Sequence, residues 1–177
     1  ADGAQWGTPQ VLTVSQEAIF DIQLAAADES ILLSYFSTPD GPLAAKKSLW
    51  VSTFSNDQWT TPEALFNQEE VLEQILSARG TTGCLLATTT SENSIQEIHW
   101  NQGVWDSPKQ VVTNADFPLD TAYDANGDLV LFWQGTDGSL RLSRRNSTGS
   151  WTHFAPEIAD TNATSLQIQP LQQDGQE

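Results

Sequence analysis

Seven tryptophans are the residues in this sequence with the clearest capacity to bind a ligand. Four of them share a pattern in which a proline follows within five residues, whereas Trp50, Trp100 and Trp133 stand outside it. Aromatic faces stack on sugar rings and anchor protein interfaces. These three tryptophans are therefore candidate ligand-binding residues, for a carbohydrate or for a protein. The alternative is that they pack between strands, the commoner role of tryptophan in a repeated all-β fold.

Cys84 is the only cysteine, so the chain forms no internal disulfide. It sits in the apolar run from Gly83 to Ala87, which favours a small core side chain over a nucleophile. Neither His99 nor His153 has an obvious route to it, so a Cys–His pair is not expected. No segment has the Asp-x-Asp-x-Asp-Gly spacing of a calcium loop. We expect neither a metal ion nor a cofactor.

The chain is strongly acidic, with 23 Asp and Glu against seven Lys and Arg and a formal net charge of -16. Binding to a nucleic-acid backbone needs clustered basic residues, so DNA and RNA are not expected partners. The same charge disfavours anionic lipid, and no stretch approaches the roughly 18 apolar residues of a membrane-spanning helix. The start Ala1-Asp2-Gly3 suits cleavage by a signal peptidase. We expect an exported protein, secreted, periplasmic or at the cell surface, kept soluble by its charge.

A repeat organises the whole chain. Its marker is a tryptophan followed by a proline and a short apolar run, and the steps between successive markers are 53, 46 and 46 residues. A period of about 40 to 50 residues is typical of a four-stranded blade of a β-propeller. The markers are Trp6, Trp59, Trp105 and Trp151.

Each marker closes a pair of predicted hairpins. In the clearest copy, Asp124–Asp128 forms a turn between two strands, with Gly127 able to take a positive φ. Leu140–Arg145 then leads through Asn146–Gly149 into Trp151, the pattern of a second hairpin. The order of elements in one blade is therefore strand, turn, strand, loop, strand, turn and outer strand.

The segment 62–76 could form a short helix by its Glu and Leu content, but we interpret 67–70 as a connection between blades, because the repeat requires it. The prediction is an all-β chain, an incomplete β-propeller of about three four-stranded antiparallel blades with single flanking strands. Its predicted segments are an outer strand of a preceding or closing blade at 1–12, blades at 13–66, 67–112 and 113–158, and the first strand of a further blade at 159–177.

The stretch from Asp124 to Trp133, Asp-Ala-Asn-Gly-Asp-Leu-Val-Leu-Phe-Trp, resembles the repeats of sialidase-like β-propellers, the group with bacterial neuraminidase repeats. The resemblance covers nearly the whole chain. One departure is the Asp-box, Ser-x-Asp-x-Gly-x-x-Trp, which the sequence does not meet. Degenerate versions of it, with the glycine too close to the tryptophan, stand at Asn146–Trp151 and Gly103–Trp105.

The resemblance implies the residues of a sialidase site: several arginines around a carboxylate, a tyrosine nucleophile with its glutamate, and an aspartate acid/base. The tyrosines are Tyr35 and Tyr123, and a core or blade-edge position suffices for both. Three blades cannot surround the central funnel that gathers such residues, so we expect no catalytic residue here. The arginines are Arg79, Arg141, Arg144 and Arg145.

These observations predict a non-catalytic extracellular propeller segment that mediates protein assembly or binds a ligand such as a carbohydrate. The alternative is a fragment of a sialidase-like glycoside hydrolase whose catalytic residues lie elsewhere. Because open sheet edges are liabilities, we expect a protein partner or missing chain to complete the propeller. Asn146 and Asn162 each begin an Asn-x-Thr sequon in a predicted turn and are candidate glycosylation sites.

Overall fold

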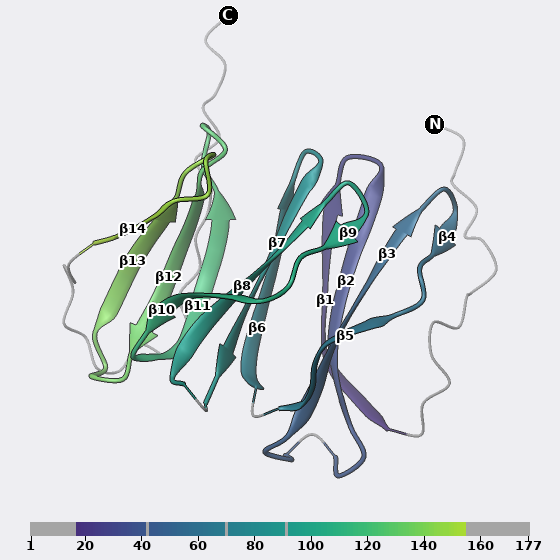
Figure 1. The fold of residues 1–177 in the computed structure, drawn as a ribbon, viewed down its shortest axis with the longest axis horizontal. Coiled ribbons are helices and arrows are strands. Elements are labelled where there is room, and N and C mark those ends of the chain that lie inside the picture. The colour runs from purple at the N-terminus through teal and green to yellow at the C-terminus, as the bar shows by residue number, and fades with distance from the viewer. Residues whose placement is uncertain (1–16, 42, 70, 91, 155–177) are drawn as a thin grey trace, which may run out of the picture.

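A computed structural model of the chain describes residues 17–41, 43–69, 71–90 and 92–154. Every regular element in these residues is a β-strand (Figure 1). The strands form three antiparallel sheets that follow one another along the chain. The prediction of an all-β chain built from antiparallel propeller blades is confirmed.

The first sheet, which we call blade 1, has its first three strands in sequence order, and two short segments pair with the third. These two segments act as one interrupted outer strand, because both run antiparallel to the same partner. The strands are β1 (Ala18–Ala27), β2 (Ser30–Thr38), β3 (Lys47–Ser55), β4 (Gln58–Trp59) and β5 (Glu63–Glu69).

Blade 2 repeats this arrangement, including the interrupted outer strand, and blade 3 has four strands in sequence order. Blade 2 consists of β6 (Val71–Arg79), β7 (Thr82–Thr89), β8 (Ser94–Asn101), β9 (Val104–Trp105) and β10 (Lys109–Thr113). Blade 3 consists of β11 (Ala115–Tyr123), β12 (Leu129–Gly135), β13 (Leu140–Arg145) and β14 (Trp151–His153).

The passage from blade 1 to blade 2 is shorter than the sequence suggests. Residues 67–69, predicted as a connection, belong to β5, because Glu69 pairs with Lys47 across the sheet. The helix considered for 62–76 does not form, since β5 and β6 occupy this segment. The flanking strands predicted at 1–12 and 159–177 lie outside the described residues.

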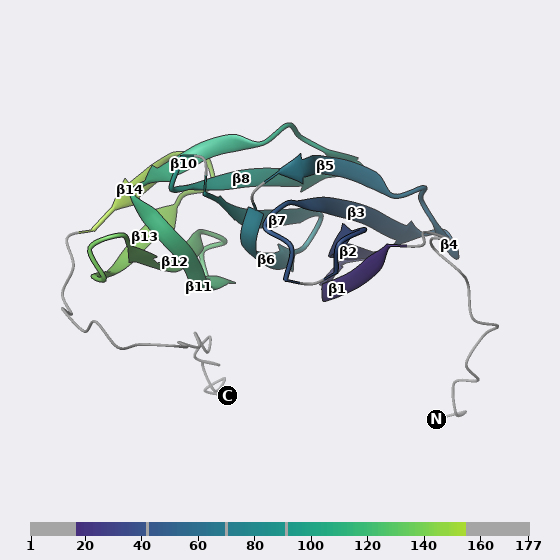
Figure 2. The same cartoon turned by 90° about the horizontal axis from the view of Figure 1, so that it is seen from below.

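The blades stack side by side in an arc (Figure 2). The first strands β1, β6 and β11 lie along one side of the arc, where β1 contacts β6 and β6 contacts β11. Two hydrophobic cores fill the spaces between blades. The first joins Leu32 and Val51 of blade 1 to Trp100 of blade 2, and the second joins Leu86 of blade 2 to Leu131 of blade 3. Most of the apolar burial is therefore between blades.

The marker tryptophans fix equivalent positions in the three blades. Each lies opposite the end of the third strand, so that Phe54 faces Trp59, Trp100 faces Trp105 and Arg145 faces Trp151. Residues at the same distance from these pairs along the strand register are equivalent in the three blades. Because strand side chains alternate, each blade has a backward face toward the preceding blade and a forward face toward the next.

The turn predicted at Asp124–Asp128 is present, with Gly127 at φ +86°. The Asp124 carboxylate accepts hydrogen bonds from the main-chain N–H groups of Asn126 and Asp128, at 2.8 and 3.0 Å. No helix among the described residues has the length and apolar character needed to cross a membrane.

Candidate functional site

The three candidate tryptophans lie on different blades, and the structure does not bring them together. Trp100 on β8 and Trp133 on β12 are buried, and Trp50 on β3 is half-buried. Trp50 Nε1 donates to Ser37 Oγ at 2.9 Å, and Trp133 Nε1 donates to Ser143 Oγ at 2.9 Å. Trp100 and Trp133 pack inside the two inter-blade cores, so each offers little more than a ring edge to solvent. The ligand-binding role of all three stays a prediction.

A cleft of about 540 Å³, which we call the β10 cleft, lies between β10 of blade 2 and blade 3. The Arg141 guanidinium lies 5.0 Å from the centre of the Trp133 ring, a cation–π contact. Arg141 is held there by Ser139 Oγ, 2.9 Å from Nε, and by Asp137 Oδ2, 2.7 Å from Nη2. The cleft therefore combines an oriented cation with polar strand groups. Its lining residues are Gln110, Val111, Val112, Thr113, Trp133, Arg141 and His153.

A second cleft, of about 470 Å³, lies between the β1–β2 turn and the hairpin ends of blade 2. Asp28 and Glu29 line one side, and Thr81, Trp100 and Gln102 line the other. The two carboxylates make this cleft unfavourable for an anionic ligand.

Five side chains meet between blades 2 and 3, and we call them the inter-blade polar cluster: Cys84, Glu97, His99, Arg145 and Trp151. Glu97 lies at the centre. Its Oε1 is 2.5 Å from His99 Nε2 and 2.6 Å from Arg145 Nε, and its Oε2 accepts a hydrogen bond from Trp151 Nε1 at 3.0 Å. The Arg145 contact is an ion pair rather than an aligned hydrogen bond. Cys84 Sγ lies 3.9 Å from Glu97 Oε1.

Strand geometry explains why these residues meet. Glu97 and His99 are two residues apart on β8 and so share a face of the sheet. Cys84 on β7 lies directly opposite His99 in the register. Sequence reasoning saw no route between this cysteine and either histidine, and the structure shows that the expectation was wrong for His99. The signal was available, since pairing the two predicted strands as a hairpin places Cys84 beside His99.

The cluster sets the ionisation of its members. Burial alone would raise the pKa of Glu97, but hydrogen bonds from His99 and Trp151 and the nearby positive charges bring it below its usual value. Burial and the Glu97 carboxylate raise the pKa of the Cys84 thiol well above its usual value. Cys84 is therefore a neutral thiol, and it lacks the thiolate character of an activated nucleophile.

The equivalent interface between blades 1 and 2 has no such cluster. Its three forward-face positions are apolar or hydroxylic and fully buried. On its backward face, the indole nitrogen equivalent to that of Trp151 belongs to Trp105 and has no hydrogen-bond partner. The equivalents of Cys84, Glu97 and His99 are Leu32, Val51 and Thr53, and those of Arg145 and Trp151 are Trp100 and Trp105.

The arginines that the resemblance singled out do not converge on a common ligand position. Arg79 of blade 2 donates to the main-chain oxygens of Asp124 and Ala125, at the first turn of blade 3. Arg144 pairs with Asp124 at 2.6 Å and with Asp128 at 3.0 Å. The other two are held in the β10 cleft and in the polar cluster. Each arginine has its own carboxylate or carbonyl partner.

The two tyrosines are both shielded from solvent, since Tyr35 is buried and Tyr123 is half-buried. Burial raises the pKa of Tyr35, and the Glu17 carboxylate adds to this rise. Burial also raises the pKa of Tyr123, to about 12.

Of the two candidate glycosylation sites, Asn146 lies exposed in the β13–β14 turn. Its Oδ1 accepts hydrogen bonds from Thr148 N, Thr148 Oγ1 and Ser150 N, so the amide already orders the turn. Asn162 lies outside the described residues. Glycosylation at either position stays a prediction.

No protein-family model and no curated protein sequence matches this chain. Solved structures do. AofleA from Arthrobotrys oligospora is 16% identical, with a TM-score of 0.54 over 82% of this chain and 46% of that one. A triple arginine-to-alanine variant of AofleA is 17% identical over the same shares, with a TM-score of 0.53. The Hadza microbial sialidase Hz136 is 14% identical, with a TM-score of 0.53 over 80% of this chain and 34% of that one.

These likenesses concern the fold, because the identities are low. The chain spans just under half of the AofleA structure and about a third of the sialidase structure. The resemblance inferred from the repeat at Asp124–Trp133 is confirmed at this level: the chain has the fold of a sialidase-like β-propeller, in three described blades.

Proposed function

We propose that the chain is a non-catalytic propeller segment that mediates assembly, with blade 1 docking against blade 3 of a second copy. The sialidase-like fold supports this proposal, because neighbouring blades cover one another's faces in a propeller. The observation that carries it is a set of apolar side chains in blade 1. They are exposed at positions that are buried in blades 2 and 3.

The exposed fractions of equivalent side chains can be compared between blades at two positions of the backward face. At the first, the exposed fraction is 62% for Leu24, against 9% for its equivalent Leu76 and 8% for Thr121. At the second, Ile31 is 40% exposed, whereas its equivalent Leu129 is 1% exposed. The preceding blade supplies this cover in blades 2 and 3.

The exposed apolar side chains on this face of blade 1 come from β1 and from the start of β2. Leu33 and Tyr35, on the same face, are buried. We call the exposed residues the β1 patch: Ile19, Ile22, Leu24 and Ile31.

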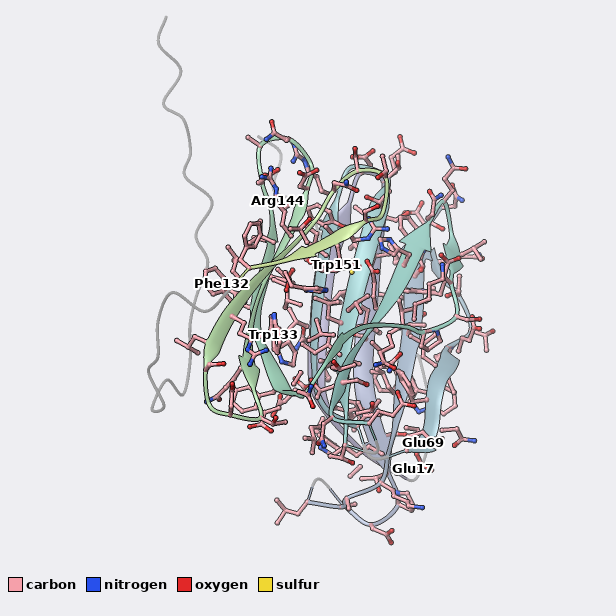
Figure 3. The ribbon with its side chains drawn as sticks, turned by 60° about the vertical axis from the view of Figure 1, so that its left-hand side comes forward. Glu17, Glu69, Phe132, Trp133, Arg144 and Trp151 are labelled. Carbon is pink, nitrogen blue, oxygen red and sulfur yellow. The ribbon has the colours of Figure 1, made fainter. Side chains whose placement is uncertain are left out.

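The other end of the arc offers a complementary surface. Val130 and Phe132 on β12 and Leu142 on β13 lie on the forward face of blade 3 and are only half-buried. Figure 3 shows Phe132 and Trp133 on opposite sides of their strand. The equivalents of Val130 and Leu142 in blade 1 are Leu32 and Val51, which blade 2 buries completely. One molecule thus has a half-buried apolar surface on the forward face of blade 3 and exposed apolar side chains on the backward face of blade 1.

A second copy can use both surfaces. Docking the β1 patch against the forward face of blade 3 is a head-to-tail contact, and such contacts form a closed ring when the rotation permits. Because this chain spans 46% of the AofleA structure, two copies have about the extent of that chain. Burying each leucine or isoleucine contributes about 1.5–3 kcal/mol. Several such residues are needed to exceed an association cost of about 4–15 kcal/mol.

The non-catalytic part of the proposal rests on the dispersed arginines. The four arginines are committed to separate partners and do not converge on one ligand position. We further propose that the protein is exported. Burial of Cys84, the single cysteine, protects the thiol from oxidation in such a compartment.

The test is the mass in solution, measured by sedimentation velocity over a range of concentrations. The expected mass is twice 19.4 kDa for the wild type. Leu24→Lys in the β1 patch and Phe132→Lys on the opposite surface are each expected to shift the mass to that of one chain. Leu43→Lys, at a fully exposed loop position, is the matched control and should leave the mass unchanged. A wild type that remains a single chain, or a Leu24→Lys variant that still dimerises, would overturn the proposal.

The β10 cleft supports carbohydrate binding as a second candidate function. Its Arg141 is oriented by Asp137 and Ser139, and charged or polar groups fixed in this way can donate to sugar hydroxyls. On a glycan array, Arg141→Ala and His153→Ala should each reduce binding at least tenfold, whereas Lys109→Ala on the same strand edge should not. Equal binding by all three variants would exclude the cleft. Turnover of a fluorogenic sialoside would support the hydrolase alternative instead.

A further inference from the structure

We propose that Cys84, Glu97 and His99 form a binding site for one zinc ion between blades 2 and 3. This inference does not depend on the proposed assembly or on sugar binding. It starts from the arrangement of one cysteine, one carboxylate and one imidazole on two paired strands of blade 2.

The three ligand atoms are already close to the spacing that a metal needs. Cys84 Sγ, a Glu97 oxygen and a His99 ring nitrogen all lie within 4.8 Å of one another. Tetrahedral zinc, with bonds of about 2.0 Å to nitrogen or oxygen and 2.3 Å to sulfur, holds such atoms about 3.3–3.5 Å apart. The observed Sγ–Oε1 distance is 3.9 Å and the Nε2–Oε1 distance is 2.5 Å, so small side-chain rotations suffice.

The paired strands β7 and β8 hold the three ligand residues at fixed positions relative to one another. Glu97 and His99 are two residues apart on β8, and Cys84 is the cross-strand partner of His99. Three ligands of this kind leave one position of a tetrahedral ion for water. Sulfur, imidazole and carboxylate ligands together suit zinc better than calcium or magnesium, which take oxygen ligands.

The repeat shows that these residues are a local departure. Blade 1 has Leu32, Val51 and Thr53 at the same positions, and blade 3 has Val130, Leu142 and Arg144. Among the described blades, blade 2 alone carries three potential ligands there. A small apolar residue would satisfy the packing at Cys84, so packing alone does not explain why all three positions differ together.

Arg145 and Trp151 fit the role of positioning partners. A ligating carboxylate is usually hydrogen-bonded by groups outside the coordination sphere. Trp151 Nε1 already donates to Glu97 Oε2 at 3.0 Å, which leaves Oε1 for the ion. Arg145 lies 2.6 Å from Oε1, and its side chain is 21% exposed, so the guanidinium can turn toward water when zinc binds.

The charge balance and the path into the site are also suitable. Zinc binding would displace the proton of the Cys84 thiol to solvent. With the resulting thiolate and the carboxylate as ligands, the zinc site is neutral, and the strongly acidic chain attracts cations. His99 is 19% exposed at its side chain, whereas Glu97 is 6% exposed. A zinc ion would therefore reach the site from the side of His99, while Cys84 and Glu97 are buried beneath it.

The test is a titration of the whole chain, kept reduced, with cobalt as a spectroscopic substitute for zinc. The expected result is one cobalt ion per chain, with a thiolate-to-cobalt charge-transfer band in the near ultraviolet and strong visible bands of a tetrahedral site. Zinc should displace the cobalt stoichiometrically. A wild type without the charge-transfer band would overturn the proposal.

Variants separate this site from adventitious binding. Cys84→Ser should abolish the charge-transfer band, and His99→Gln should weaken binding at least tenfold, while His153→Gln, the other histidine, should bind as the wild type does. Circular dichroism and tryptophan fluorescence check that each variant is folded. The band should disappear in denaturant, since Cys84 and His99 meet only in the folded sheet. A folded His99→Gln variant with unchanged affinity, or a band that persists in denaturant, would refute the site.

Discussion

The ion pair between Glu97 and Arg145 makes a quantitative prediction about how blade 3 is held on blade 2. Replacing Arg145 with Leu removes the cation 2.6 Å from Glu97 Oε1 and leaves a carboxylate whose side chain is 6% exposed. Breaking a buried pair by removing one partner costs about 3–5 kcal/mol. His99 and Trp151 still contact the carboxylate, so we expect the lower end, about 3 kcal/mol.

The reverse change is expected to be milder. Glu97→Val leaves Arg145 able to reach water, because its side chain is 21% exposed. The main loss is the acceptor for the half-buried Trp151 indole, which costs about 1–3 kcal/mol. The double variant then reproduces the apolar pairing of the interface between blades 1 and 2, where Val51 stands at the position of Glu97. Replacing both partners of a buried pair by apolar groups is often neutral.

The assay is urea unfolding of the four proteins, monitored by tryptophan fluorescence and circular dichroism together. The double variant should be at least as stable as Arg145→Leu alone, with a loss of about 1–3 kcal/mol from the wild type, because Trp151 Nε1 still lacks its acceptor. The two single losses are then less than additive by about 3 kcal/mol. Additive losses, with the double variant least stable, would refute the reasoning. They would show that the two residues stabilise the interface independently.

Three further predictions concern packing and titration. Gly83→Ala places a Cβ 2.2 Å from the buried Leu32 Cδ1, so it should lower the free energy of unfolding by about 1–3 kcal/mol. Gly135→Ala meets the movable Asp137 carboxylate and should cost less in the same urea experiment. Hydrogen bonds from Ser139 and Arg141 lower the pKa of Asp137 to about 2, below its usual 3.8. Its stabilising contribution is therefore present above pH 3.8 and lost as the pH falls toward 2, and Asp137→Asn should flatten that part of the stability profile. Tyr123, with a pKa of about 12 in the fold against a usual 10, should give a late step in an ultraviolet titration. Stability should decline as the pH rises above 10, and Tyr123→Phe should remove the late step.

The blade architecture could be predicted because its signal is repeated. The tryptophans at positions 59, 105 and 151 recur at a constant distance from a turn, and each sits opposite the end of a third strand. The Asp124–Asp128 turn carries residues with a specific backbone requirement, which Gly127 meets. Periodicity and turn chemistry are local properties, so one sequence is enough to detect them.

The polar cluster was missed because it depends on pairing rather than on spacing. Cys84 and His99 are 15 residues apart, a separation that matches no metal-ligand motif, yet they are directly opposite in the β7–β8 register. Arg145 joins them from another blade. For the three unmatched tryptophans, the sequence left two roles open, ligand binding and packing. Two of them, Trp100 and Trp133, pack in the spaces between blades, and the binding role of all three stays a prediction.

The cluster also bears on how copies would assemble. The forward face of blade 2 presents Glu97, which requires a cation from the blade that follows, and Arg145 supplies it. The backward face of blade 1 has Phe54 at the position of Arg145, so a blade 1 docked on blade 2 would leave the buried carboxylate without its counter-ion. The forward face of blade 3 is apolar at the corresponding position, where Leu142 stands. In the proposed assembly, a blade 1 from another copy would therefore match the forward face of blade 3 better than the forward face of blade 2, where Glu97 needs a cation.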